Sequence, residues 1–176
     1  MELEYHEMAS GLRFPEGPIA LSDGSVLLLE IERQTLSRVL VNGTIQVVAT
    51  LEGGPNGAAV GPDGAIYICN NGGFNWIERN SRLLPGTQPE HFDGGSIQRV
   101  EMSSGKVDTI YRDCSENILR GPNDIVFAKD GSFWFTDLGK MRDRDKDYGG
   151  LYFANIDGTH IEEKIFPIPG GGNGVG

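Results

Sequence analysis

Residues 122–131 read Pro122-Asn123-Asp124-Ile125-Val126-Phe127-Ala128-Lys129-Asp130-Gly131. The same pattern occurs at residues 15–24 and 55–64, where a Pro and an oxygen-bearing side chain open a short apolar run and an Asp-Gly pair closes it. In each copy the Asp comes seven residues after that side chain (16 to 23, 56 to 63 and 123 to 130). Residues 172–176 begin the pattern a fourth time. Repetition at this interval is typical of proteins built from an array of equivalent units.

Each copy of the pattern is followed by segments that predict further strands. Residues 25–31, 65–69 and 132–136 are short, apolar and rich in β-branched and aromatic side chains, as strands are. Two more strands joined by a turn follow in every unit, at 35–41 and 44–49, at 95–102 and 106–111, and at 150–155 and 159–166. No segment shows a helical period. The chain is therefore predicted to be all-β.

Four short antiparallel strands in each repeat predict the blades of a β-propeller. We expect about three four-stranded blades, approximately at residues 12–51, 52–112 and 119–167, and the start of a fourth, within a single domain. Residues 71–94 lengthen the second blade, and we expect an inserted loop that covers one end of the channel, because long loops in compact domains are usually functional. Closed propellers have about four to eight blades, so the sequence looks incomplete. Its open strand edges predict self-association.

Composition narrows the class of protein and its partners. The chain has 176 residues, a hydrophobic fraction of 38% and a net charge of −10. This charge argues against nucleic acid or an anionic membrane as a partner, and no apolar run approaches the length of a membrane span. The N-terminus has no apolar segment typical of a secretion signal, and the two cysteines form no C-x-x-C pair. We therefore expect a cytoplasmic protein.

The repeated pattern also predicts a site. In a propeller the first strand of each blade lines the central channel, so equivalent positions of these strands face one another across the axis. Those positions are Glu16, Asn56, Asn123 and Asn173. Oxygen donors without sulfur or imidazole suit a hard cation, Ca²⁺ first, with Mg²⁺, Mn²⁺ or Zn²⁺ as alternatives. The ordinary explanation is that these side chains only satisfy backbone groups beside Pro and Gly.

Residues 14–18, 121–137 and 172–176 together resemble the SMP-30/gluconolactonase family. The resemblance covers essentially the whole chain as the N-terminal half of a member. It implies a six-bladed propeller with one divalent metal in the channel, and for many members the hydrolysis of sugar lactones. By position, Glu16 matches the metal carboxylate of the first blade and Asn173 the metal Asn of the middle of the chain. Asn123 matches an Asn at the metal and the substrate.

The resemblance also implies what this chain lacks. Arg120 resembles an Arg that contacts substrate, although Gly121-Pro122 shifts its spacing. Together with Asn56 and Asn123 it makes up the predicted substrate-binding set. The remaining metal ligand of the family is an Asp that is also the proposed general base, and it lies in a later blade, beyond Gly176. A set of three ligand candidates with a single carboxylate predicts weak metal affinity.

The leading functional hypothesis is metal-dependent hydrolysis of a sugar lactone, with this chain as an incomplete part that is not an efficient catalyst by itself. In such a reaction the metal polarises the ring carbonyl and a carboxylate activates water. One alternative is a related propeller that hydrolyses another lactone or ester. A second alternative is a propeller that only binds or acts as a scaffold, in which the Asn side chains merely hold the channel together.

Overall fold

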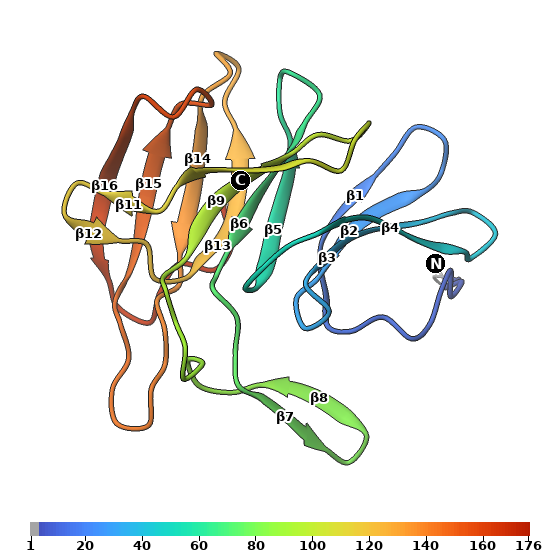
Figure 1. Ribbon diagram of the computed structural model, residues 1–176, viewed down its shortest axis with the longest axis horizontal. Helices are drawn as coiled ribbons and strands as arrows, with labels where there is room; N and C mark the ends of the chain where they lie inside the picture. Colours follow the sequence, from blue (N-terminus) through green and yellow to red (C-terminus); the bar gives the residue numbers. More distant parts are fainter. Residues whose placement is uncertain (1–3) are drawn as a thin grey trace.

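The computed structural model describes residues 4–176, and this part of the chain consists of strands and loops without a helix (Figure 1). Three antiparallel four-stranded sheets follow one another along the chain. The first contains β1 (Pro15–Ala20), β2 (Val26–Glu30), β3 (Thr35–Val39) and β4 (Ile45–Thr50). The second contains β5 (Pro55–Val60), β6 (Ile66–Asn70), β9 (Ser96–Val100) and β10 (Val107–Tyr111). The third contains β13 (Pro122–Phe127), β14 (Phe133–Asp137), β15 (Gly149–Ala154) and β16 (Ile161–Ile168).

The Asp-Gly pair of the repeated pattern makes the turn between the first and second strands of each sheet. The glycines have the positive φ that L side chains rarely adopt, 81° at Gly24 and 87° at Gly131. The carboxylate of Asp23 accepts a hydrogen bond from the backbone N–H two residues later, at 3.0 Å, and Asp130 does the same at 3.0 Å. An Asp that bonds its own backbone in this way favours a turn. The pattern recurs because the same turn recurs.

The core consists of two apolar layers, one between each pair of neighbouring sheets. All five residues of β6 are buried, because the second sheet is covered on both faces. Ile66 and Ile68 belong to the cluster shared with the first sheet. Tyr67 and Cys69 belong to the cluster shared with the third sheet. Since successive side chains of a strand point to opposite faces, one short apolar run stabilises both interfaces.

Two small hairpins lie outside the three sheets. The insertion predicted at 71–94 leaves the second sheet between β6 and β9 and forms the hairpin of β7 (Trp76–Arg79) and β8 (Arg82–Pro85). Figure 1 shows this hairpin projecting away from the sheets. A second hairpin, of β11 (Asp113–Cys114) and β12 (Asn117–Ile118), joins the second sheet to the third. Neither hairpin was expected from the sequence. Within residues 4–176, no helix has the length and apolar character needed to cross a bilayer.

Candidate functional site

The first strands of the three sheets lie side by side and place the repeated pattern in the same register. A methyl group on Gly17 would lie 2.7 Å from the carbonyl oxygen of Asn56, and one on Gly57 would lie 2.3 Å from the carbonyl oxygen of Asn123. Such distances leave no room for a side chain at either glycine. The two glycines therefore allow the strands to approach closely. Their contacts bring together the backbones at Glu16, Asn56 and Asn123, in this order.

The side chains at these positions become less exposed from the first sheet to the third. Glu16 is exposed, Asn56 is half-buried and Asn123 is only 9% exposed. None of the three side chains makes a hydrogen bond or an ion pair with the residues that the structure describes. A buried amide usually finds a partner, so the oxygen and nitrogen of Asn123 are available to a ligand. The metal role of Glu16 and the substrate role of Asn56 remain predictions.

Residues 172–176 are held against β13 by two side chains that the sequence did not single out. The hydroxyl of Thr136 donates to the Asn173 carbonyl at 2.8 Å and accepts from the Asp124 N–H at 3.2 Å. The Asp124 carboxylate accepts from the Val175 N–H at 3.0 Å. These bonds place Asn173, whose side chain is exposed, beside the Asn123-Asp124 pair. All four predicted positions thus follow one another around the innermost strands.

The donor set decides which cation these positions could hold. Among residues 4–176 no group of three or more His, Cys, Asp or Glu is arranged to hold a metal ion. A cation bound here would therefore rely on the Glu16 carboxylate and on amide or carbonyl oxygens of Asn123 and Asn173. Neutral oxygens with few carboxylates are compatible with Ca²⁺ at modest affinity. They do not suit a metal that requires thiolate ligands, such as Cu(I).

A second set of equivalent residues ends the second strand of each sheet. Glu30, Asn70 and Asp137 are buried, and each accepts hydrogen bonds from the backbone that enters the first strand of its own sheet. The donors are Arg13 N at 2.8 Å, Gly54 N at 2.8 Å, and both Arg120 N at 2.8 Å and Gly121 N at 2.7 Å. These bonds fix where the first strand begins. The sequence contains a signal for these three residues, because each of them follows the Pro of its repeated pattern by 15 residues (15 to 30, 55 to 70, 122 to 137).

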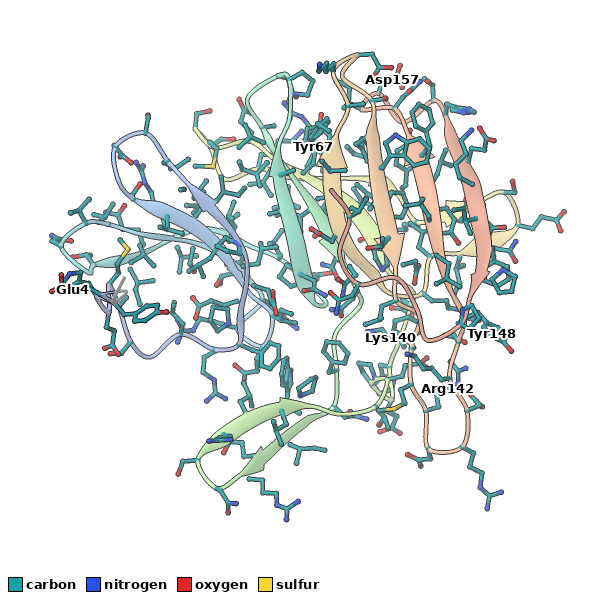
Figure 2. The ribbon with its side chains drawn as sticks, turned by 180° about the vertical axis from the view of Figure 1, so that it is seen from behind. Glu4, Tyr67, Lys140, Arg142, Tyr148 and Asp157 are labelled. Carbon is teal, nitrogen blue, oxygen red and sulfur yellow. The ribbon has the colours of Figure 1, made fainter. Side chains whose placement is uncertain are left out.

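Asp137 and Lys140 are the buried charges of the third sheet. Burial raises the pKa of Asp137, although N–H groups of Gly139, Arg120 and Gly121 bond its carboxylate and oppose that shift. Burial lowers the pKa of Lys140 to about 7, against the opposing influence of the Asp137 and Asp147 carboxylates. Figure 2 shows Lys140, Arg142 and Tyr148 at the same end of the molecule, opposite Asp157.

Lys140 joins the third sheet to the insertion. Its Nζ donates to Asn71 Oδ1 at 3.1 Å and to the Gly73 carbonyl at 2.7 Å. It also lies 4.2 Å from the ring centroid of Phe74, close enough for a cation–π interaction. The amide nitrogen of Asn71 is buried without a recorded partner. One lysine therefore fixes the base of the inserted segment.

The far part of the insertion is tied to the first sheet, next to Glu16. The ring of Trp76 packs 5.2 Å from that of Phe14, centroid to centroid. Arg13 pairs with Glu32 at 2.7 Å and reaches Glu78 of β7 at 3.3 Å. Phe14 is two residues before Glu16, so the β7–β8 hairpin contacts the segment that carries the predicted metal carboxylate. That the insertion covers one end of the channel stays a prediction.

Arg120 lies in a different place from the predicted metal residues. Its side chain lines a cavity of about 480 Å³, together with residues of β12, β15, β16 and the loop between β14 and β15. Glu16, Asn56, Asn123 and Asn173 do not line that cavity. Arg120 precedes the Gly121-Pro122 pair and lies outside β13, which begins at Pro122. Its role at a substrate in the channel stays a prediction.

Comparison with known proteins identifies one family. Residues 14–175 match the family model described as SMP-30/Gluconolactonase/LRE-like region. A gluconolactonase of Zymomonas mobilis is 22% identical over 172 residues, which cover 86% of this chain and 42% of that protein. The chain thus spans less than half the length of this curated relative.

Two solved structures share the fold. A gluconolactonase of Xanthomonas campestris, described as important in glucose secondary metabolic pathways, superposes with a TM-score of 0.63 at 19% identity, over 88% of this chain and 48% of that one. A structure described as a putative gluconolactonase gives a TM-score of 0.62 at 18% identity, over 91% of this chain and 51% of the other. These likenesses confirm the predicted all-β propeller architecture.

Proposed function

Because this chain belongs to the SMP-30/gluconolactonase/LRE-like family, we propose that it contributes to the hydrolysis of a sugar lactone that is assisted by a divalent metal ion. The family match over residues 14–175 is the observation that carries the proposal. The register of Glu16, Asn56 and Asn123 along adjacent strands, with Asn173 in the segment beside β13, supports it. The similarity to gluconolactonases indicates a small lactone as the substrate class.

The oxygens of Glu16, Asn123 and Asn173 would hold the ion. Glu16 would supply a negatively charged ligand, and the amides of Asn123 and Asn173 would supply neutral oxygen ligands to the ion. Ca²⁺ fits this set best, with Mg²⁺, Mn²⁺ or Zn²⁺ as alternatives. A divalent ion at such a site supplies Lewis-acid polarisation of an ester carbonyl.

The residues of the chain itself would bind and orient the lactone. Asn123 offers both an amide donor and a carbonyl acceptor, and its 9% exposure places it in a largely dry environment. Asn56 lies on the adjacent strand and could bond a ring hydroxyl in the same way. The Asp124 carboxylate is already engaged by the N–H groups of Val175 and Ile125, so it positions the backbone around Asn123 and Asn173. We assign the general base to no residue of this chain.

Hydrolysis of a gluconolactone by the complete gene product, followed as base consumption in a pH-stat, tests the proposal. We expect a rate above the spontaneous one, loss of this excess on treatment with EDTA, and its return with Ca²⁺. Glu16→Gln should lower the excess rate at least roughly tenfold. Mutating a residue that only supports a metal ligand already lowers activity by about this factor. Glu7→Gln, a change at an exposed carboxylate outside the strands, should leave the rate as it is.

A full rate after EDTA treatment would contradict the metal requirement. A related hydrolase with another ester substrate would then be favoured if other lactones or esters were cleaved. If no lactone or ester were cleaved, the alternative of a propeller that only binds or acts as a scaffold would be favoured. The lack of a carboxylate cluster among residues 4–176 is the observation that favours this second candidate.

A further inference from the structure

The cavity next to Arg120 is lined by none of the four repeated positions. Its walls come from β12, β16 and the loop between β14 and β15, and its floor contains Asp137 and Tyr152. Its volume of about 480 Å³ lies in the range of sites for small molecules. The third sheet lines the cavity with the face that it turns toward the second sheet. Tyr152 shows this, because it belongs to the core between those two sheets. The cavity therefore lies between the second and third sheets of the described chain.

A guanidinium without a hydrogen bond lies at the cavity. The backbone N–H of Arg120 is fixed by Asp137 at 2.8 Å, but the structure describes no hydrogen bond from its side chain. The nearest carboxylate oxygen, on Asp147, is 4.0 Å from Arg120 Nε. Asp147 is already paired with Arg142 at 2.7 Å and accepts the Lys140 N–H at 3.1 Å. The five guanidinium donors of Arg120 are thus free for an outside acceptor.

Acceptors face the cavity from other walls. The Tyr152 hydroxyl donates to Glu163 Oε2 at 3.2 Å, which leaves the second carboxylate oxygen of Glu163 without a described partner. Glu116 and Asn117 line the same cavity and make no described side-chain hydrogen bond. The lining therefore presents free donors and free acceptors together. Hydroxyl groups can satisfy both, since each one donates and accepts.

An exposed apolar wall completes the cavity. Tyr148 and Phe166 pack edge to face with centroids 6.4 Å apart, yet their side chains are 57% and 54% exposed. Ile118 of β12 is 45% exposed and lines the same cavity. Apolar side chains that are exposed next to one another at a concave surface are typical of binding sites. A flat ligand face made of C–H groups would cover this wall.

From these features we propose that the cavity binds the pyranose ring of a neutral sugar. The C–H face of the ring would pack on Tyr148 and Phe166, and its hydroxyls would accept from Arg120 and donate to Glu163 and Glu116. An anionic ligand does not suit the lining, because its four carboxylates outnumber its two cations, Arg120 and Lys146. The proposal does not depend on the lactone chemistry of the channel.

Saturation-transfer NMR on the unmodified 176-residue chain with methyl β-glucopyranoside tests the proposal. We expect transfer that is strongest on the ring C–H protons, with a dissociation constant of about 1 mM, since so small a ligand gains little free energy per atom. Tyr148→Ala and Arg120→Gln should each weaken binding by roughly 3- to 10-fold, in line with the loss of one aromatic or polar contact. Both residues are exposed, so the variants should fold, as circular dichroism will check.

Two control variants separate this cavity from other surfaces. Tyr5→Ala removes an 85% exposed tyrosine outside the cavity, and Glu16→Gln alters the channel; both should bind the glycoside as the unmodified chain does. The proposal would be overturned if no transfer were seen, or if Tyr148→Ala and Arg120→Gln both bound the glycoside as tightly as the unmodified chain. Loss of transfer in Glu16→Gln would place the ligand in the channel instead. Stronger transfer to gluconate than to the glycoside would overturn the assignment of a neutral sugar.

Discussion

At the scale of single residues, the third sheet carries buried charges that structure the end of the molecule near the predicted site. Asp137 and Lys140 are 3% and 1% exposed. Asp137 fixes the backbone of Arg120 and Gly121, and hence the entry to the strand that bears Asn123. Lys140 bonds the insertion through Asn71 and Gly73. Asp137 also lines the cavity next to Arg120, and both side chains position segments that carry predicted site residues.

The pKa of Lys140 predicts a dependence of stability on pH. In the unfolded chain a lysine titrates near its ordinary value of about 10.4, whereas burial lowers the pKa in the folded protein to about 7. Between these values the unfolded state binds more protons, so this residue makes the free energy of unfolding rise with pH, and its effect is constant below about pH 7.

Urea denaturation at pH 7 and pH 10, for the unmodified chain and for Lys140→Met, measures this effect. The variant cannot titrate at this position, so the unmodified chain should gain roughly 3 kcal/mol relative to it between the two pH values. Groups that the two proteins share cancel in this difference. Parallel pH profiles of the two proteins would show that Lys140 titrates normally.

At the scale of elements, the close approach of β1, β5 and β13 is what gathers the repeated positions. It depends on small residues directly after the predicted ligands. At Gly57 even one added carbon would lie 2.3 Å from the backbone oxygen of Asn123 and 2.7 Å from the Asp124 Cα. Backbone atoms at the centre of a packed sheet cannot move aside as a flexible side chain can.

Gly57→Ala should therefore destabilise the protein by about 1 to 3 kcal/mol, the usual cost of overpacking a core. Gly174→Ala is the matched control from the fourth copy of the pattern. There the new methyl would meet nothing nearer than Asp124 Oδ2 at 3.8 Å, so we expect little change. Chemical denaturation of both variants measures the difference. Equal stability of the two would mean that the strands tolerate a wider separation than the structure shows.

At the scale of the whole molecule, the architecture could be predicted because its signals are local. The Asp-Gly turns, the alternating strands and the repeat interval all lie in short windows of sequence, and they predicted three four-stranded sheets and the insertion between β6 and β9. The same repeated pattern predicted that Glu16, Asn56, Asn123 and Asn173 occupy equivalent positions.

Other features depend on contacts between distant segments and could not be predicted in this way. Lys140 is buried only because residues 71–74 fold back over it, and the sugar cavity exists only because the β11–β12 hairpin faces β16. The role of Asp137 could have been inferred, since the interval of 15 residues after each Pro is visible in the sequence. Glu30, Asn70 and Asp137 differ in chemical type, so residue identity alone does not reveal their equivalence.

Metal binding by the assembled channel positions is the central claim, and calorimetric titration of the 176-residue chain with Ca²⁺ tests it most directly. With one carboxylate in the set, we expect saturable binding of one ion with a dissociation constant of about 0.1 to 1 mM, in the range of weak Ca²⁺ sites. Glu16→Gln should weaken this binding at least roughly tenfold, because it removes the charged ligand, while Glu7→Gln should match the unmodified chain. A flat titration, or the same binding curve for Glu16→Gln, would contradict the account.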